Sequence, residues 1–109
     1  MKGILFIGNS LQVIRAFPGD AKRETGYQLD RVQRGLDPTN WKPMTSIGQG
    51  VREIRIQEQG QWRIIYIAKF DDAIYVLHAF QKKAQKTPKP DIETAKRALG
   101  VVIQRFRDE

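Results

Sequence analysis

Three runs of apolar, strand-forming residues lie within residues 51–90 and form the most regular pattern in the chain. The first contains Val51, Ile54 and Ile56, the second contains residues 64–67 (IIYI), and the third contains residues 74–77 (IYVL). Short polar segments at residues 59–61 and 71–72 separate the runs, and this spacing predicts antiparallel hairpins. The second run is apolar at almost every position after Arg63, which predicts a central strand covered on both faces.

The N-terminal part of the chain predicts one strand and two helices. Residues 4–7 (ILFI) form a short apolar run, which we expect to be an edge or partner strand of the later sheet. The Asn-Ser pair that follows offers an N-cap for a helix over residues 11–17. A second helix is predicted to begin at Asp20 and to end at Gly35. We expect the two helices to form an antiparallel hairpin on one face of the sheet.

The remaining segments are a connection and a final helix. Residues 36–50 are rich in Asp, Pro, Thr, Asn, Gly and Ser, which predicts an irregular connection that Trp41 and Met44 pin to the core. Base stacking is the alternative role for Trp41. Thr87 and Pro88 have the character of an N-cap and a first helical residue. The helix that follows has apolar residues at helical spacing, namely Ile92, Ala95, Leu99, Val102 and Phe106.

The predicted order is strand, helix, helix, three antiparallel strands and helix, an α+β fold in a single domain over residues 1–109. An N-terminal strand and a helical hairpin would pack on a small, mainly antiparallel sheet, and a C-terminal helix would follow it. Hydrophobic residues make up 40% of the chain and charged residues 28%, which is typical of a globular protein rather than a disordered segment. Gly26 and Gly100 lie inside predicted helices and are expected to weaken them.

The composition restricts the chemistry that the chain can support. It contains no cysteine, which excludes disulfides and thiolate metal sites, and its single histidine argues against a zinc site. We therefore expect no metal and no cofactor. The apolar run near the N-terminus is too short for a secretory signal or a membrane span. A cytoplasmic protein without a membrane partner is the resulting expectation.

The charge of the chain points to an acidic partner. The formal net charge is +7, and such an excess favours nucleic acids or acidic proteins, although it can also serve solubility alone. Basic side chains and the only histidine lie in or directly after the three predicted strands: Arg52, Arg55, Arg63, His78, Lys82, Lys83, Lys86 and Lys89. The four lysines have no acidic residue among them, so we expect cations to converge at one end of the sheet.

Several local patterns resemble the RelE/ParE toxin superfamily, and within it the phage-derived, HigB-type branch. They are VREIR at residues 51–55, WRIIY at 62–66, LHAFQKK at 77–83 and KTP at 86–88. The resemblance covers nearly the whole chain, and residues 77–88 are its most specific part. It implies a RelE-like fold and the toxin of a type II toxin–antitoxin system. Such toxins are ribosome-dependent mRNA endonucleases (mRNA interferases), and a co-encoded antitoxin with a helix-turn-helix domain silences them.

The resemblance also implies a cationic active site that works without a metal. In such enzymes the 2′-hydroxyl of one nucleotide attacks the adjacent phosphate. Arg63 matches the arginine that clamps the phosphate, because a guanidinium can hold two phosphate oxygens in fixed geometry. Arg55 matches a basic position and should share a face with Glu53. Lys82 and Lys83 match the basic step that supplies a catalytic cation.

The other candidate residues have weaker assignments. His78 is a natural acid or base at neutral pH, with a half-buried structural role as the alternative. Arg52, Lys86 and Lys89 are predicted to bind RNA. Tyr66 could also contact a phosphate or a base, but its position along the strand should turn it away from Arg63, which favours core packing.

Two departures from the family pattern keep other functions open. Glu53 lies where some relatives have a basic residue, and we interpret it as an ion-pair partner of an arginine rather than as a general base. No histidine or tyrosine follows His78, which leaves fewer acid–base groups than in the best-characterised members. The alternatives are a ParE-like inhibitor of DNA gyrase and a non-catalytic protein that binds RNA or the ribosome. The cation cluster favours the nuclease over the gyrase inhibitor.

Overall fold

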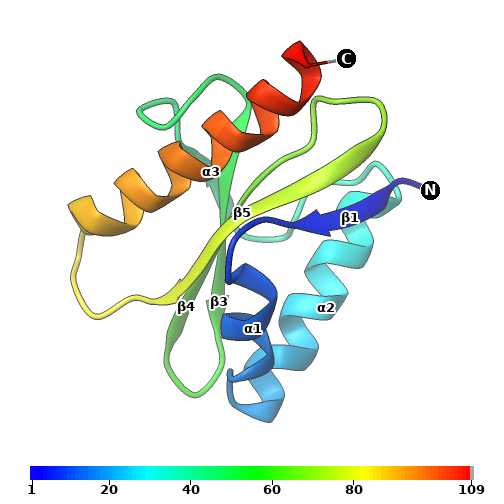
Figure 1. Ribbon diagram of the computed structural model, residues 1–109. Helices are drawn as coiled ribbons and strands as arrows, with labels where there is room; N and C mark the ends of the chain where they lie inside the picture. Colours follow the sequence, from blue (N-terminus) through cyan, green and yellow to red (C-terminus); the bar gives the residue numbers. More distant parts are fainter. Residues whose placement is uncertain (109) are drawn as a thin grey trace.

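A mixed, five-stranded sheet forms the centre of the protein in the computed structural model, which describes residues 1–108 (Figure 1). Its elements are β1 (Gly3–Phe6), α1 (Ser10–Arg15), α2 (Gly19–Gln33), β2 (Trp41–Pro43), β3 (Val51–Gln57), β4 (Gln61–Ile67), β5 (Ala73–Gln81) and α3 (Lys89–Arg107). The strand order is β1-β5-β4-β3-β2, in which β1 is parallel to β5 and every other pair is antiparallel. The predicted α+β, RelE-like architecture is confirmed.

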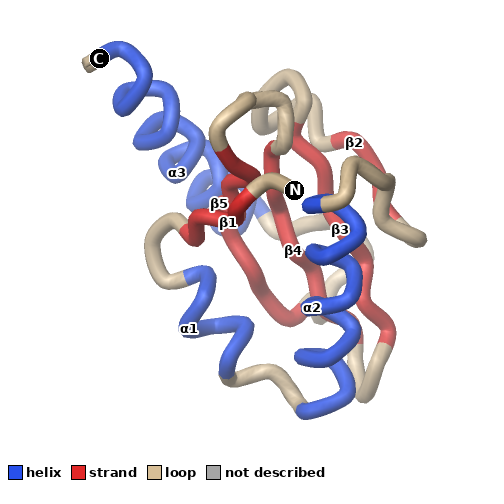
Figure 2. The backbone as a smooth tube through the Cα atoms, turned by 90° about the vertical axis from the view of Figure 1, so that its right-hand side faces the viewer, coloured by secondary structure: helices blue, strands red, loops and turns tan. Residues whose placement is uncertain are grey.

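Helices cover both faces of this sheet and create two separate cores (Figure 2). On one face, α1 and α2 pack against alternate strand residues, including Ile54, Ile64 and Ile74. On the other face, α3 packs against the intervening residues, including Ile65 and Tyr75. Because β4 lies between β3 and β5 with a helical layer on each side, its residues from the second to the last are all buried. The prediction of a doubly covered central strand is therefore confirmed, as is the placement of the first two helices on one face.

A β-bulge interrupts the pairing of β4 with β5. Ile65 lies opposite His78, whereas the next residue, Tyr66, lies opposite Val76. Leu77 is therefore the extra residue on β5, and such a bulge changes which side chains face each side of a sheet. As a result, the consecutive residues Leu77 and His78 both lie on the face of the sheet that α3 covers.

The segment over residues 36–50 contains a short strand that the sequence did not indicate. β2 has three residues and pairs antiparallel with β3, so that Trp41 lies opposite Ile54 and Lys42 opposite Glu53. A run this short, ending in Pro43, carries no alternation of apolar and polar residues. The prediction of a wholly irregular connection is therefore wrong for this part, because pairing with β3 creates the strand.

The starts of two helices differ from the predicted caps. α3 begins at Lys89 with Pro88 in the N-cap position, so Thr87 is not the cap that we expected. At α1, Asn9 occupies the N-cap position but its side chain forms no capping hydrogen bond. Ser10, the first helical residue, instead donates a hydrogen bond from its hydroxyl to the carbonyl of Val76. The hydroxyl of Thr87 likewise donates to the carboxylate of Glu53 in β3, so both hydroxyls bond to the sheet rather than to a helix end.

Within residues 1–108, none of the helices combines the length and the apolar character needed to cross a lipid bilayer.

Candidate functional site

Two rows of side chains run across the strands on the face that α3 covers. The first, which we call the carboxylate row, consists of Lys42, Glu53, Ile65 and His78 on β2, β3, β4 and β5. The second, the arginine row, consists of Arg55, Arg63 and Phe80 on β3, β4 and β5. Residues two apart on a strand point to the same side, so the two rows lie next to each other on one face. The predicted shared face of Arg55 and Glu53 is confirmed.

Glu53 lies at the centre of the carboxylate row and has no exposed surface. Its Oε2 accepts a hydrogen bond of 2.8 Å from the hydroxyl of Thr87. Its Oε1 lies 3.6 Å from Nε of Arg63 and 3.9 Å from Nζ of Lys42. A buried carboxylate is tolerated only when cations or hydrogen-bond donors surround it. The expected ion pair between Glu53 and an arginine is therefore present.

Arg63 is also buried, with 5% of its surface exposed. Its Nη1 donates to the carbonyl of Trp62 at 2.9 Å, and its Nη2 donates weakly to Oε1 of Gln61 at 3.5 Å. Burial lowers the pKa of Arg63, and the nearby charge of Arg55 lowers it further, while Glu53 acts in the opposite direction. The fold thus holds a charged guanidinium in a site that disfavours its charge, and a second anion there would relieve that cost.

Arg55 lies directly opposite Arg63 in the register of β3 and β4. Its Nε is buried and has no hydrogen-bond acceptor among the described residues, and the same holds for Nε of Arg63. Like charges that face each other on neighbouring strands repel, and an unsatisfied buried N–H is costly. The pair is therefore suited to an incoming acceptor with negative charge, such as a phosphate oxygen.

Lys82 adds a further positive charge to the cluster. Its backbone N–H donates to the carbonyl of Gln61 at 2.7 Å, which fixes it beside the start of β4. Burial lowers the pKa of its ammonium group, the charge of Arg63 lowers it further, and Glu53 opposes both. Lys83, by contrast, is exposed, as are Lys86 and Lys89. The structure thus brings Lys82 together with the two arginines and leaves the other three predicted lysines at the surface.

His78 ends the carboxylate row and contacts the first turn of α3. Its Nε2 lies 2.7 Å from Oδ1 of Asp91, and its ring stacks on Phe80 with 5.3 Å between the ring centroids. These contacts fit the structural role that was the alternative for this residue. A role in acid–base chemistry stays a prediction.

Three residues of this site were not anticipated from the sequence: Lys42, Thr87 and Asp91. Lys42 belongs to a strand without a recognisable pattern, and Thr87 was assigned to a helix cap. Asp91 resembles the acidic residue that commonly occupies the first turn of a helix. The signal for Thr87 in the sequence is its place in the KTP pattern at residues 86–88, which does not show that its hydroxyl reaches Glu53.

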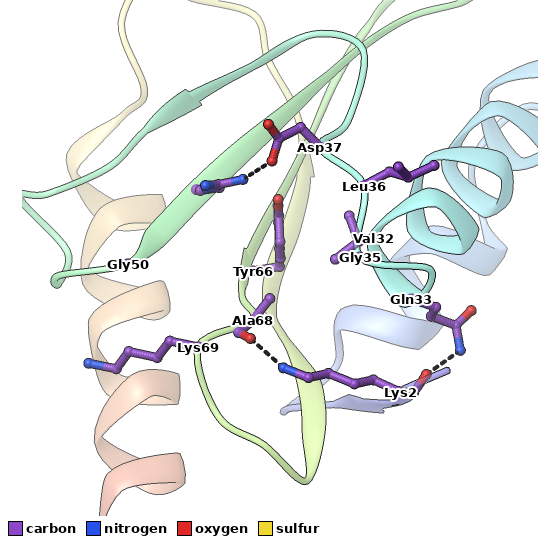
Figure 3. Close-up of a pocket in the computed structure, with 11 residues that line it drawn as sticks. Lys2, Val32, Gln33, Gly35, Leu36, Asp37, Gly50, Tyr66, Ala68 and Lys69 are labelled. Atoms are coloured by element: carbon purple, nitrogen blue, oxygen red, sulfur yellow. Dashed lines mark hydrogen bonds and ion pairs between the residues drawn. The ribbon is translucent and has the colours of Figure 1, made fainter.

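Arg52 and Tyr66 lie on the opposite face of the sheet, where α2 packs, so they do not join the two arginine-row cations. Together with residues of α2 and the segment before β2, they line a cavity of about 370 Å³ (Figure 3). Nη1 of Arg52 pairs with Oδ1 of Asp37 at 2.8 Å, and its guanidinium lies 3.9 Å from the ring centre of Trp41. The expected orientation of Tyr66 away from Arg63, and its burial, are confirmed.

The electrostatics of this second cluster show that it is internally satisfied. Burial acts to lower the pKa of Arg52, but hydrogen bonds to Asp37 and Tyr66 raise it above its ordinary value. Burial raises the pKa of Tyr66, and Arg52 partly offsets this. The guanidinium of Arg52 therefore already has an anionic and a phenolic hydrogen-bond partner, whereas Nε of Arg55 and Nε of Arg63 on the other face have no hydrogen-bond acceptor among the described residues.

The comparison with known families assigns the chain. The family model described as "Phage derived protein Gp49-like (DUF891)" matches residues 12–100. The chain belongs to this phage-derived, Gp49-like family. The family is a RelE/toxin-like one, and the matched range contains both rows together with Lys82, Thr87 and Asp91. No curated protein sequence matches the chain.

Proposed function

We propose that this Gp49-like protein is the toxin of a type II toxin–antitoxin system, of the HigB type, and that it acts as a ribosome-dependent mRNA endonuclease. The observation that carries the proposal is the cluster of Arg55, Arg63 and Lys82, in which two buried guanidinium N–H groups have no acceptor among the described residues. A site of this kind, in a RelE/toxin-like family, favours binding and cleavage of a phosphodiester.

The proposed chemistry is an internal phosphoryl transfer within the RNA. A 2′-hydroxyl loses its proton and its oxygen forms a bond to the adjacent phosphorus, while the bond from phosphorus to the 5′-oxygen breaks. That oxygen takes up a proton, which leaves a cyclic phosphate and a free 5′-hydroxyl. Arg55 and Arg63 would hold the non-bridging oxygens, where charge increases in the transition state, and Lys82 would stabilise the same charge. His78 is the candidate for moving a proton.

The proposed partners follow from the same charge pattern. The ribosome and its mRNA present phosphates to a chain of net charge +7. An antitoxin with a helix-turn-helix domain would block this access, and an acidic segment on it would complement the exposed lysines 83, 86 and 89.

The test is primer extension on a reporter mRNA after a short pulse of expression. The wild type is compared with Arg63→Ala and Lys82→Ala, and Lys96→Ala, which removes an exposed lysine on α3, is the matched control. We expect cuts only within translated frames, retained in the control and reduced at least 100-fold in Arg63→Ala, as for loss of one transition-state donor.

Other outcomes select other functions. Growth arrest with intact mRNA and a DNA-damage response would favour the gyrase inhibitor. Ribosome binding without cleavage would favour the non-catalytic protein. Cleavage that persists in both site variants would keep the nuclease but refute this site.

A further inference from the structure

Three buried side-chain nitrogen and oxygen atoms of the described residues lack a hydrogen-bond partner, and all three belong to one cluster. They are Oε1 of Glu53, Nε of Arg55 and Nε of Arg63. Buried polar groups nearly always have a hydrogen-bond partner. Glu53 and Arg55 lie two residues apart on β3 and Arg63 lies opposite Arg55 on β4, so their three unpaired atoms need a common explanation. Glu53 and Arg63 carry opposite charges but stay 3.6 Å apart, which is too far for a good hydrogen bond. The two side chains therefore attract each other electrostatically without forming a hydrogen bond between these two atoms.

The charges of the cluster do not balance. One carboxylate, that of Glu53, faces cations on three strands and on the segment after β5. They are Lys42, Arg55, Arg63 and Lys82. A carboxylate and a phosphate present similar pairs of oxygens to a guanidinium, so they compete for the same donors. Glu53 therefore stands where a phosphate of a bound RNA would gain the most from these cations.

We propose that Glu53 is a built-in substitute for the substrate phosphate. It holds the cations of the phosphate subsite in place while the site is empty, and it gives up Arg63 when an RNA phosphate binds. This inference rests on the proposed function for the identity of the anion, an RNA phosphodiester. It makes Glu53 a positioning residue, since it touches the phosphate-binding arginine rather than the reacting atoms.

The burial of the site supports this exchange. Arg63 is almost fully buried, so a phosphate reaches it only if surrounding residues move. Residues 83–87 donate no backbone hydrogen bond to another backbone group in the described part of the chain. Their side-chain anchor is the bond from Thr87 to Glu53. Displacement of the Glu53 carboxylate would therefore also release residues 83–87 from the carboxylate that Arg63 pairs with.

The experiment measures binding of inorganic phosphate at constant ionic strength, by calorimetry and by the shift of the unfolding temperature. Glu53→Gln keeps the shape of the side chain and removes its charge. We expect it to bind phosphate at least tenfold more tightly than the wild type, a difference of about 1.4 kcal/mol. Glu58→Gln makes the same change at an exposed position in the β3–β4 turn and should leave phosphate binding unchanged.

A second variant keeps the test decisive if Glu53→Gln does not fold. Lys42→Gln removes the positive charge of a half-exposed residue whose Nζ lies 3.9 Å from Oε1 of Glu53. This variant should bind phosphate several-fold more weakly than the wild type. The double variant, in which the two charge changes balance, should then bind phosphate more tightly than Lys42→Gln alone. Unchanged or weaker binding on removal of the Glu53 charge overturns the inference.

The outcomes also separate this inference from the proposed function. If Glu53→Gln binds phosphate more tightly but the wild type leaves mRNA intact, the anion site stands and the nuclease is refuted. If mRNA is cut but the Glu53 charge has no effect on phosphate binding, the nuclease stands and the role of Glu53 is refuted.

Discussion

The hydroxyl of Thr87 donates a hydrogen bond of 2.8 Å to Oε2 of Glu53, which ties the residue before Pro88 to a residue 34 positions earlier in β3. Both groups are shielded from bulk water, because Glu53 is fully buried and Thr87 is nearly so. The bond therefore joins the lysine-rich segment, the start of α3 and the centre of the sheet at one point.

Thr87→Val should destabilise the protein, because it leaves a buried carboxylate oxygen without its donor. We expect the free energy of unfolding to fall by about 1–3 kcal/mol, the usual cost of an unsatisfied buried polar group. Urea denaturation measures this change. Thr87→Ser keeps the hydroxyl and should retain most of the stability. Equal stability of the valine variant and the wild type would show that the bond contributes nothing.

Lys82 and Lys83 should differ in their effect on cleavage, and in the opposite order to the sequence-based expectation that Lys83 converges with Arg55 and Arg63. Lys82 lies in the field of Arg63 and Glu53, whereas Lys83 is exposed. In the primer-extension assay, we expect Lys82→Gln to reduce cleavage at least tenfold more than Lys83→Gln does. The reverse order would mean that the segment rearranges on the ribosome and brings Lys83 to the phosphate.

Lys82 should also make stability depend on pH in the alkaline range. Its pKa is lowered from 10.5 in the folded protein, so the unfolded chain binds this proton more tightly. The charged form thus destabilises the fold at neutral pH, and the cost disappears as the pH rises through the folded pKa towards the unfolded one. Lys82→Met should be more stable than the wild type at pH 7, by less than about 1 kcal/mol because the group is partly solvated.

The advantage of Lys82→Met over the wild type should shrink as the pH approaches 10.5, the ordinary lysine value. Thermal unfolding at several pH values measures it, with Lys96→Met as an exposed reference on α3. A difference that does not change with pH would show that packing, not charge, causes the effect.

Gly100→Ala should stabilise α3 without disturbing the core. A Cβ at this position would meet no atom within 4 Å, and alanine favours a helix over glycine by about 1 kcal/mol. Gly48→Ala is the contrasting variant, because its Cβ would lie 2.5 Å from Cδ2 of Leu99. Urea denaturation should show a gain for the first and a loss for the second. A loss for Gly100→Ala would contradict the open space around that residue.

Local sequence patterns were sufficient for most elements of the fold. The apolar run after Arg63 predicted the buried central strand β4, and the helical spacing from Ile92 onwards predicted α3, because burial imposes a period of two on strands and 3.6 on helices. The pattern failed at β2, whose three residues are too few to show either period. Pairing with β3 determines that strand, and pairing is not a local property.

The candidate site shows the same division. The sequence by itself determined that Arg55 and Glu53 share one side of a strand, since alternation along a strand follows from backbone geometry, and that Arg63 lies early in the central strand. Only the tertiary structure decided that Lys82 rather than Lys83 joins them, and that Thr87 and Lys42 complete the surroundings of Glu53. These contacts depend on strand register and on the path of the chain between β5 and α3, which are set by the packing of the whole sheet.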